Sequence, residues 1–419
     1  MEAGLDGLGR RSALALGGAG ISGVAMIGSI IIASRSLSAG GAGEFFVAIS
    51  LFAIVQGICS FGAETGFQYF VPTMSTQEAR RLIRIVASAS AVLGVVTATA
   101  VWLGAEPLGE LFAEAETAPG TADVIRTIAV LLPFAGLYEL TMGALRACDR
   151  VLLSVGVDRI IQPLLQITLM LSVASAGGSS SALVLAWATP FVVATIAASV
   201  LLVVLPPGSN VDQPVDVTQR IFWRYTAPRS IARIAQTMTQ RLDVMILAAV
   251  YPLGEVAVYG TVSRCMIAGV FVATALRQTV QPRLRRLIVD GDRVGVKNMY
   301  GVSTTWLVLV TWPVYLTMIA FAPLVMSVFG PEYVRGAPAL VLLCSAMLVA
   351  SACGLVDVVL LMLGRSWLSS INIVIALVAN IALNLILAPR FGMIGSAIAW
   401  VVAILGSNLL PLLQTLRFG

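Results

Sequence analysis

Five polar residues lie within one apolar segment of the chain, and their spacing places them on one side of a helix. In chain order they are Arg229, Arg233, Gln236, Gln240 and Asp243. At about 100° per residue, all five fall within an arc of about 80° that runs about 21 Å along a helix. An arginine at the centre of a bilayer costs roughly 2.5–3.5 kcal/mol, so we expect this stripe to face water or protein. The stripe therefore predicts a surface that binds an anion.

The two arginines at the start of the stripe suit a phosphate or a diphosphate. A guanidinium group stays charged and donates paired hydrogen bonds to two phosphate oxygens. Arg229 and Arg233 are one helical turn apart, so one diphosphate could meet both. For Arg229 a second interpretation stays open, because a long side chain near the interface can simply extend into the aqueous phase. Arg233 lies one turn deeper and is the stronger candidate.

Two further arginines, Arg241 and Arg264, extend the predicted anion-binding surface toward the other side of the membrane. Asp243 lies near both in the predicted arrangement. An ion pair of Asp243 with either arginine that only joins two helices is an open alternative.

Four carboxylates fall within the predicted membrane spans, where an ionisable side chain is a functional candidate by default. We interpret them as candidate sites for coupling to H⁺ or Na⁺, or as counter-ions of the arginines: Glu64, Glu139, Asp243 and Asp357. Structural burial with a partner is the alternative for each, and no other cofactor is expected. Three asparagines could bind sugar hydroxyls, although packing between helices is the favoured interpretation: Asn372, Asn380 and Asn384.

These side chains require helices that cross a membrane. The chain is 58% hydrophobic and only 11% charged, whereas a soluble domain averages about 25% charged residues. Apolar runs of at least about 18 residues recur along the whole chain, so the fold class is an all-α polytopic membrane protein. We predict twelve spans: 12–34, 46–73, 83–104, 124–146, 160–178, 182–205, 225–250, 256–280, 299–321, 338–362, 368–388 and 393–415.

The basic residues orient these spans. With the N-terminus inside, the cytoplasmic segments hold 18 of the 26 basic residues and the external loops hold three. By the positive-inside rule, this bias predicts that both termini are cytoplasmic. The net charge of +5 therefore reflects topology rather than a surface for nucleic acid. We expect 12–34 to be kept as a span, because it has no small-residue cleavage site before a soluble domain.

The chain divides into two similar halves. A polar segment at 206–220 falls near the midpoint and predicts a linker between six-helix bundles at 1–206 and 207–419. Residues 41–50 resemble 254–263, and residues 145–154 resemble 360–369, at nearly the same offset. An even number of spans in each half gives both halves the same orientation, so we expect parallel repeats.

No spacing of residues indicates an enzyme or a metal site. The chain has no histidine, and its five cysteines lack metal-ligand spacing and are expected to be small buried hydrophobes. The longest external loop, about 105–123, is too short for a catalytic domain, and no glycine-rich phosphate loop precedes a helix of a soluble domain.

Several motifs in the second half give the chain a family resemblance. They are GEVAVYGTVSR (254–264), QPRLRRLIVDGDRVGVKN (281–298), VFGPEYVRGAPAL (328–340), LMLGRSW (361–367) and APRFGMIGSAIAW (388–400), and GAGEFFVAISLFAIVQGICSFGAETGFQYFVP (41–72) fits less tightly. In order and spacing they resemble the polysaccharide flippase branch of the multidrug/oligosaccharidyl-lipid/polysaccharide (MOP) exporter superfamily. The resemblance implies two six-helix bundles around a central cavity that work by alternating access.

The resemblance also implies a substrate, a polyprenyl-diphosphate-linked oligosaccharide, and a location, the bacterial inner membrane. Such a flippase would serve the synthesis of exopolysaccharide, capsule or O-antigen, with membrane lipid, a polysaccharide polymerase and chain-length machinery as partners. Relatives that flip the peptidoglycan lipid precursor carry cavity arginines on their first two helices, whereas here the second span offers Glu64. That precursor flippase and a secondary exporter of small organic molecules are the alternative functions.

Overall fold

The computed structural model describes residues 2–205, 219–266, 273, 276, 277, 280, 281, 283, 284, 286–288, 290–362 and 366–418. This part of the chain is helical and contains no strand. Eight of its helical segments are long and apolar enough to cross a membrane. The prediction of an all-α multi-pass membrane protein is therefore confirmed.

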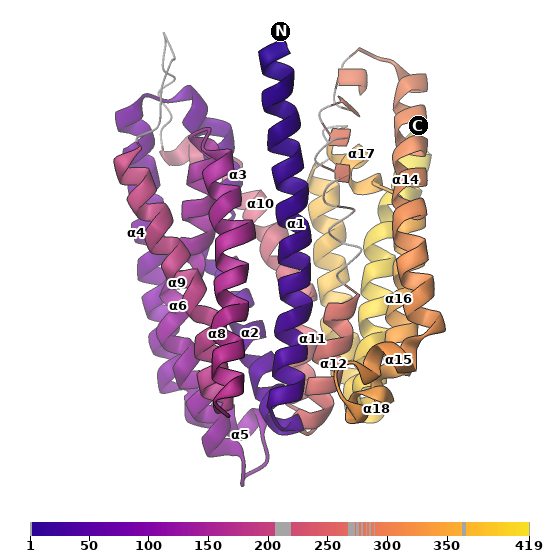
Figure 1. Ribbon diagram of the computed structural model, residues 1–419. Helices are drawn as coiled ribbons and strands as arrows, with labels where there is room; N and C mark the ends of the chain where they lie inside the picture. The colour runs from indigo at the N-terminus through magenta and orange to yellow at the C-terminus, as the bar shows by residue number, and fades with distance from the viewer. Residues whose placement is uncertain are drawn as a thin grey trace. The chain divides into compact units, whose positions relative to one another are not determined.

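The chain forms two compact units, Met1–Thr237 and Met238–Gly419. The first unit is shown in Figure 1 from indigo through magenta to the pink of α10. Its elements are α1 (Glu2–Ser36), α2 (Ala39–Cys59), α3 (Ala63–Phe70), η1 (Val71–Thr73), α4 (Thr76–Leu103), α5 (Ala105–Phe112), α6 (Ala118–Ala147), α7 (Val151–Val155), η2 (Gly156–Ile161), α8 (Gln162–Ser175), α9 (Ser180–Val204) and most of α10 (Gln219–Thr239).

Helix α6 is the centre of the first unit and packs against α2, α3, α4, α5 and α9. Buried apolar side chains occur along most of its length, as Ile125, Ile128 and Leu132 illustrate. The neighbouring α4 begins with a capping box, in which Ser75 and Glu78 bind each other's backbone amides. A central helix with buried neighbours on several sides is a rigid support for any polar side chain that it carries.

The second predicted span, 46–73, is not one helix. Phe61 and Gly62 both adopt left-handed conformations, with φ of 50° and 57°, which no α-helix continues. The chain therefore leaves α2 and restarts as α3. This break puts Gln56 in α2 and the candidate Glu64 in α3.

The predicted span 225–250 is also interrupted. The prediction that Arg229 to Asp243 form a single stripe on one helix was therefore wrong. Helix α10 ends at Thr239, and α11 (Leu242–Ala248) begins after Arg241, whose φ of −131° and ψ of −28° depart from α-helical geometry. Asp243 Oδ1 accepts a hydrogen bond of 2.8 Å from the Val244 amide. A short acidic side chain that binds its own backbone competes with helix continuation, which accounts for a new helix start here.

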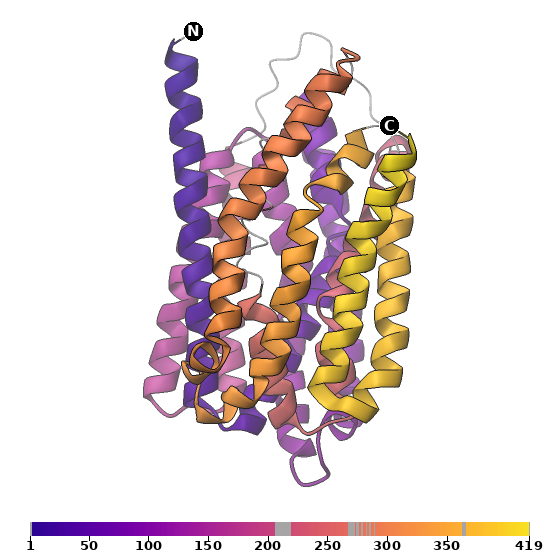
Figure 2. The ribbon, with the colours of Figure 1, turned by 90° about the vertical axis from the view of Figure 1, so that its right-hand side faces the viewer.

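The second unit has its own central helix. Its elements are α11, α12 (Leu253–Cys265), α14 (Arg293–Ala320), α15 (Ala322–Ser327), η3 (Pro331–Gly336), α16 (Ala337–Ala352), α17 (Val356–Met362) and α18 (Ser366–Phe418). Helix α16 packs against α12, α14, α15 and α18. The two last predicted spans form the two arms of α18, which turn back on each other at Gly392 (φ 55°), as Figure 2 shows.

Each unit contains its own polar contact, and the two contacts lie at equivalent places in the two units. Near the start of α2, the Glu44 carboxylate accepts a hydrogen bond of 3.0 Å from Thr121, at the start of α6. At the start of α12, Glu255 pairs at 2.6 Å with Arg335, just before α16. In each unit an acid on the second span thus joins the start of the fourth, as expected for parallel repeats. The boundary at residues 206/207 stays a prediction, since 206–218 lie outside the described residues.

Candidate functional site

The close contact between α10 and the α2–α3 turn positions the two candidate arginines. A Cβ atom on Gly62 would lie 2.9 Å from the Cα of Ser230, and one on Gly66 would lie 2.4 Å from Thr226 Oγ1. Only glycine allows two backbones to approach so closely. The Ser230 hydroxyl donates to the Phe61 carbonyl, which the helix break leaves free. Helix α10 is thereby fixed beside α3.

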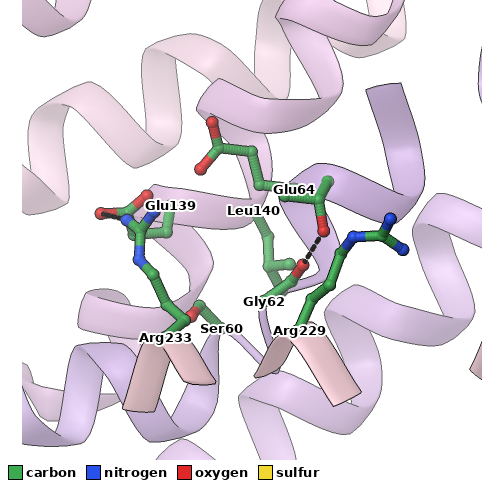
Figure 3. Close-up of a pocket in the computed structure, with 8 residues that line it drawn as sticks. Ser60, Gly62, Glu64, Glu139, Leu140, Arg229 and Arg233 are labelled. Atoms are coloured by element: carbon green, nitrogen blue, oxygen red, sulfur yellow. Dashed lines mark hydrogen bonds and ion pairs between the residues drawn. The ribbon is translucent and has the colours of Figure 1, made fainter. Parts of the chain in front are cut away.

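A small cavity opens at this contact, within the first unit. Its walls come from the α2–α3 turn, α3, α6 and α10, and Figure 3 shows the side chains that line it: Ser60, Gly62, Glu64, Thr65, Glu139, Leu140, Arg229 and Arg233. Four predicted site residues, Arg229, Arg233, Glu64 and Glu139, therefore meet in one place. The volume open to water-sized molecules is about 30 Å³, enough for roughly two waters.

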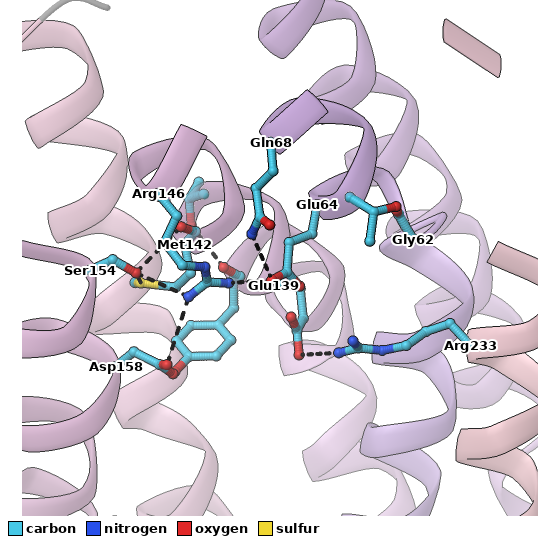
Figure 4. Close-up of polar contacts among 12 residues, drawn as sticks. Gly62, Glu64, Gln68, Glu139, Met142, Arg146, Ser154, Asp158 and Arg233 are labelled. Carbon is cyan, nitrogen blue, oxygen red and sulfur yellow. Dashed lines mark hydrogen bonds and ion pairs between the residues drawn. The ribbon is translucent and has the colours of Figure 1, made fainter. Parts of the chain in front are cut away.

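Arg233 faces a carboxylate across this cavity. Its Nη2 lies 3.5 Å from Oε1 of Glu139 on α6 (Figure 4). The Arg233 side chain is 50% exposed and that of Glu139 is 24% exposed. A charge-assisted hydrogen bond is usually 2.7–2.9 Å long, so this pair is loose. Arg233 therefore keeps donors for a second anion.

Arg229 lies one turn away and forms no ion pair with any described residue. Its guanidinium carbon lies 3.9 Å from the centre of the Tyr225 ring, and its Nη1 donates a hydrogen bond of 3.2 Å to the Tyr225 carbonyl. A cation held against an aromatic ring keeps its charge available to other ligands. Arg229 is thus held at the cavity wall with its charge uncompensated by a carboxylate.

Behind the cavity, a third arginine, Arg146, partly neutralises Glu64 and Asp158 (Figure 4). Arg146 of α6 lies 3.0 Å from Glu64 and 3.9 Å from Asp158, and it donates a hydrogen bond of 3.0 Å to Ser154. Gln68 donates a hydrogen bond of 3.3 Å to Glu64. Arg146 therefore fixes Glu64 against α6 and reduces its repulsion of an incoming anion.

Asp158 and Tyr138 are parts of this network that the sequence analysis missed. Asp158 lies in the π-helical turn η2, inside the apolar segment Val151–Ser175, although the predicted span begins only at residue 160. It accepts a hydrogen bond from the Tyr138 hydroxyl and lies 3.2 Å from Arg159. An Asp–Arg pair next to an apolar run was the available signal, and π-turns are frequent at functional sites.

Of the remaining candidate residues, Gln236 lies on α10 in the first unit, whereas Gln240, Arg241, Asp243 and Arg264 lie in the second unit. Asp243 is buried and accepts a hydrogen bond of 2.6 Å from Tyr259. Arg264 is also buried and donates a hydrogen bond of 2.8 Å to the Gly260 carbonyl. Gln236 and Gln240 are exposed, and Arg241 precedes α11 as a half-buried residue. The roles of these residues stay predictions.

The last candidates lie deeper in the second unit. Asp357 of α17 forms an ion pair with Arg277, so it has a counter-ion. Asn372 and Gln414 exchange hydrogen bonds of 2.9 and 3.0 Å between the two arms of α18, which agrees with the packing interpretation. Asn380 and Asn384 are fully buried, and Asn384 donates to the carbonyl of Asn380 at 3.0 Å.

Comparison with known proteins places these features in a family. A family model described as "Polysaccharide biosynthesis protein" matches residues 44–338. The chain is 22% identical over 193 residues to the "Probable low-salt glycan biosynthesis flippase Agl15" of Haloferax volcanii. That match covers 46% of this chain and 41% of the relative, so it spans less than half of either protein.

Solved structures resemble the whole chain. An inward-facing multidrug resistance MATE family transporter of the MOP superfamily matches with a TM-score of 0.77 and 14% identity, over 97% of this chain and 98% of the transporter. The lipid II flippase MurJ in an inward closed conformation matches with a TM-score of 0.78 and 13% identity, over 97% of this chain and 87% of the flippase. At such low identity these matches show the fold alone.

Proposed function

Since the chain belongs to the polysaccharide biosynthesis protein family of the MOP exporter superfamily, we propose that it is a flippase for a polyprenyl-diphosphate-linked oligosaccharide. It would act in the bacterial inner membrane during the synthesis of a surface polysaccharide. Membrane lipid would surround the polyprenyl tail, and a polysaccharide polymerase with its chain-length machinery would use the product.

The observation that carries this proposal is the pair of arginines on α10. Arg229 and Arg233 line one cavity, and only Arg233 has a carboxylate partner there, a loose one at 3.5 Å. Two guanidinium groups one turn apart can each take one phosphate of a diphosphate through a forked contact. The basic end of α10 is also the end that the charge distribution assigns to the cytoplasm, where lipid-linked precursors would load.

The size of the cavity indicates that loading involves a rearrangement. Space for roughly two waters is smaller than a diphosphate, so in this proposal the substrate widens the cavity by separating Arg233 from Glu139. A substrate that binds more tightly when Arg233 and Glu139 are apart shifts the protein toward that state. Alternating access requires such a difference in affinity between two states. Arg241, Arg264, Gln236 and Gln240 are the proposed further contacts along the path.

Coupling to H⁺ or Na⁺ is part of the proposal, with four candidate carboxylates. Glu64 and Glu139 are half-buried at the cavity beside arginines, and Asp357 is paired with Arg277. Asp243 is the buried candidate, with a hydrogen bond from Tyr259. A cation that replaced an arginine as the partner of one of these acids would free that arginine for the diphosphate.

Reconstitution tests the proposed function directly. The full chain in vesicles should move a fluorescent undecaprenyl-diphosphate-linked oligosaccharide between leaflets. Arg233→Ala should weaken binding of this substrate about 10- to 150-fold, because a hydrogen bond to a charged group contributes about 1.5–3 kcal/mol. Arg126→Ala is the matched control, since Arg126 lies on α6 of the same unit but pairs with Glu106 and does not line the cavity. Absence of translocation by the unsubstituted protein would refute the proposal.

A second candidate function rests on the acids in the same cavity. Glu64 and Glu139 could hold an organic cation, which would make the protein a secondary exporter of small molecules. In that case Glu139→Gln would abolish efflux of a cationic dye, and Arg233→Ala would leave the display of surface polysaccharide intact. Dye efflux by the reconstituted protein without lipid translocation would favour the exporter. The loose Arg233–Glu139 pair favours the flippase, because Arg233 keeps donors for an anion.

A further inference from the structure

The exposed side of α3 is polar, although α3 lies within a predicted membrane span. Ala63, Gly66, Phe67 and Phe70 are its buried residues. The side chains that stay exposed or half-buried are Glu64, Thr65, Gln68 and Tyr69, and they fall within an arc of about 140°. A helix side that faced lipid would be apolar. This side of α3 therefore faces an aqueous or protein-lined space, and the cavity with Glu64 and Thr65 in its wall is continuous with it.

Tyr69 presents an open aromatic ring at the end of this polar side. The Tyr69 residue is 58% exposed. One side of its ring stacks on Tyr225 of α10, with ring centres 4.4 Å apart and planes inclined by 24°, while Phe70 packs edge-on at 4.8 Å. Two aromatic neighbours thus fix the orientation of the ring and leave its other side accessible.

The same Tyr225 ring also holds one of the candidate arginines. The guanidinium carbon of Arg229 lies 3.9 Å from its centre. Tyr225 and Arg229 are one turn apart on α10, about 6 Å along the axis. An accessible aromatic ring and a guanidinium group are therefore held at the same tyrosine. The Tyr69 ring centre lies 4.4 Å and the Arg229 guanidinium carbon lies 3.9 Å from the centre of the Tyr225 ring, so these two groups are at most about 8 Å apart, which is on the scale of one sugar attached to a phosphate.

We infer that Tyr69 and Tyr225 form a saccharide subsite next to the anion-binding arginines, in which Tyr69 stacks on the sugar linked to the diphosphate. This inference rests on the proposed function and specifies where its substrate's first sugar lies. One side of a pyranose ring presents C–H groups, which pack against the electron-rich side of an aromatic ring. The hydroxyl groups at the rim of the sugar remain free for hydrogen bonds.

Polar groups for those hydroxyls lie on the same side of α3. Gln68 uses its amide nitrogen to bind Glu64 Oε1 at 3.3 Å, which directs its amide group toward the cavity side of the helix. Its carbonyl oxygen can accept a hydrogen bond from a sugar hydroxyl. An aromatic platform flanked by amide and carboxylate acceptors suits a hydroxylated ring, whose hydroxyl groups donate to those acceptors.

An interfacial anchor is the competing explanation for an exposed tyrosine in a membrane protein. An anchor would act on the membrane and would be indifferent to a sugar. Trp102 offers a matched control, because it is 49% exposed on α4 and also carries an arginine, Arg126, at 5.9 Å from its ring. That pair lies outside the cavity.

The test compares two probes that differ only in the sugar. The full chain in lipid nanodiscs is titrated with undecaprenyl diphosphate and with undecaprenyl diphosphate-linked N-acetylglucosamine. Stacking of aromatic groups contributes about 0.5–1.5 kcal/mol, so Tyr69→Ala should raise Kd for the sugar-bearing probe about two- to tenfold. Kd for the sugar-free probe should stay unchanged. Tyr69→Phe should bind as the unsubstituted protein does, and Tyr69→Leu, which keeps apolar bulk, should behave like Tyr69→Ala.

The outcomes separate the subsite from the proposed function. Equal loss of both probes in Tyr69→Ala, or the same sugar-dependent loss in Trp102→Ala, would overturn the saccharide subsite. Equal affinity of the unsubstituted protein for both probes would overturn the subsite alone and leave diphosphate recognition intact. An unsubstituted protein that binds neither probe would overturn both. Loss of the sugar-bearing probe in the Ala and Leu variants, with Phe and Trp102→Ala unaffected, supports the subsite.

Discussion

Glu139→Gln should make the protein bind a lipid diphosphate more tightly, although it replaces a carboxylate of the cavity wall. The Glu139 carboxylate lies 3.5 Å from Nη2 of Arg233 and so competes with a phosphate for the same guanidinium group. Glutamine keeps the size of the side chain and its hydrogen-bonding ability but removes the negative charge. The substitution therefore removes both the competitor and its repulsion of an incoming anion.

The exposure and length of the pair set the size of this effect. Exposed ion pairs contribute about 0.2–1 kcal/mol, whereas breaking a buried pair costs about 3–5 kcal/mol. Arg233 is 50% exposed and Glu139 is 24% exposed, and their separation is longer than that of a charge-assisted hydrogen bond. The pair therefore lies near the weaker limit, at about 1 kcal/mol. This free energy corresponds to about a fivefold decrease in Kd.

Tighter binding should not accelerate translocation. A substrate drives the change between two states only through the difference between its affinities for them. If Arg233 must return to Glu139 when the diphosphate leaves, Glu139→Gln removes the group that helps to displace the product. We expect a lower translocation rate in vesicles together with a lower Kd for undecaprenyl diphosphate in nanodiscs.

Two further variants check this reasoning. Glu106→Gln removes the same charge from an exposed pair with Arg126 and should leave Kd unchanged. In an Arg233→Ala background, Glu139→Gln should lose most of its effect, because the competition acts through that arginine. A Kd that is unchanged or higher in the Glu139→Gln single variant would refute the proposed competition.

Two other predictions concern how the site is held together. Gly62→Ala should lower the stability of the first unit by about 1–3 kcal/mol, since it combines a strained φ of 57° with a contact of 2.9 Å to Ser230. In the same thermal unfolding assay, Gly177→Ala is the control for backbone strain alone, because Gly177 has a φ of 68° and open space around it. Arg146→Ala should destabilise the protein by about 2–3 kcal/mol because it leaves the half-buried Glu64 without its partner; a melting temperature equal to that of the unsubstituted protein would contradict the assigned network.

The sequence predicted the parts of the fold that depend on local apolar patterns. Long apolar runs correctly located α4, α6 and α9, because each such run must cross the membrane as a helix. The four-residue spacing of Arg229 and Arg233 correctly put both side chains on one side of one helix, where they now line the same cavity.

The parts that failed depend on contacts between distant residues. The break at Phe61 involves Ser230 on another helix, 169 positions away, so no local pattern signals it. Glu139 and Arg146 lie on the same helix, yet Arg146 lies against Glu64 and Glu139 lies against Arg233. Helical periodicity gives the direction of a side chain around its own axis, but the partner depends on how helices pack.

The π-turn at Gly156–Ile161 changes how the faces of its span are counted. Such a turn accommodates one residue more than an α-helical turn, so the helical phase slips by one position, about 100°, across it. Residues of α8 therefore lie on the sides that an uninterrupted helix would give to residues numbered one lower. A relative that lacks one residue at this turn would therefore keep the packing sides of α7 and α8 in register. The loss of one residue inside α6 would instead rotate every later side chain of that helix away from its partner.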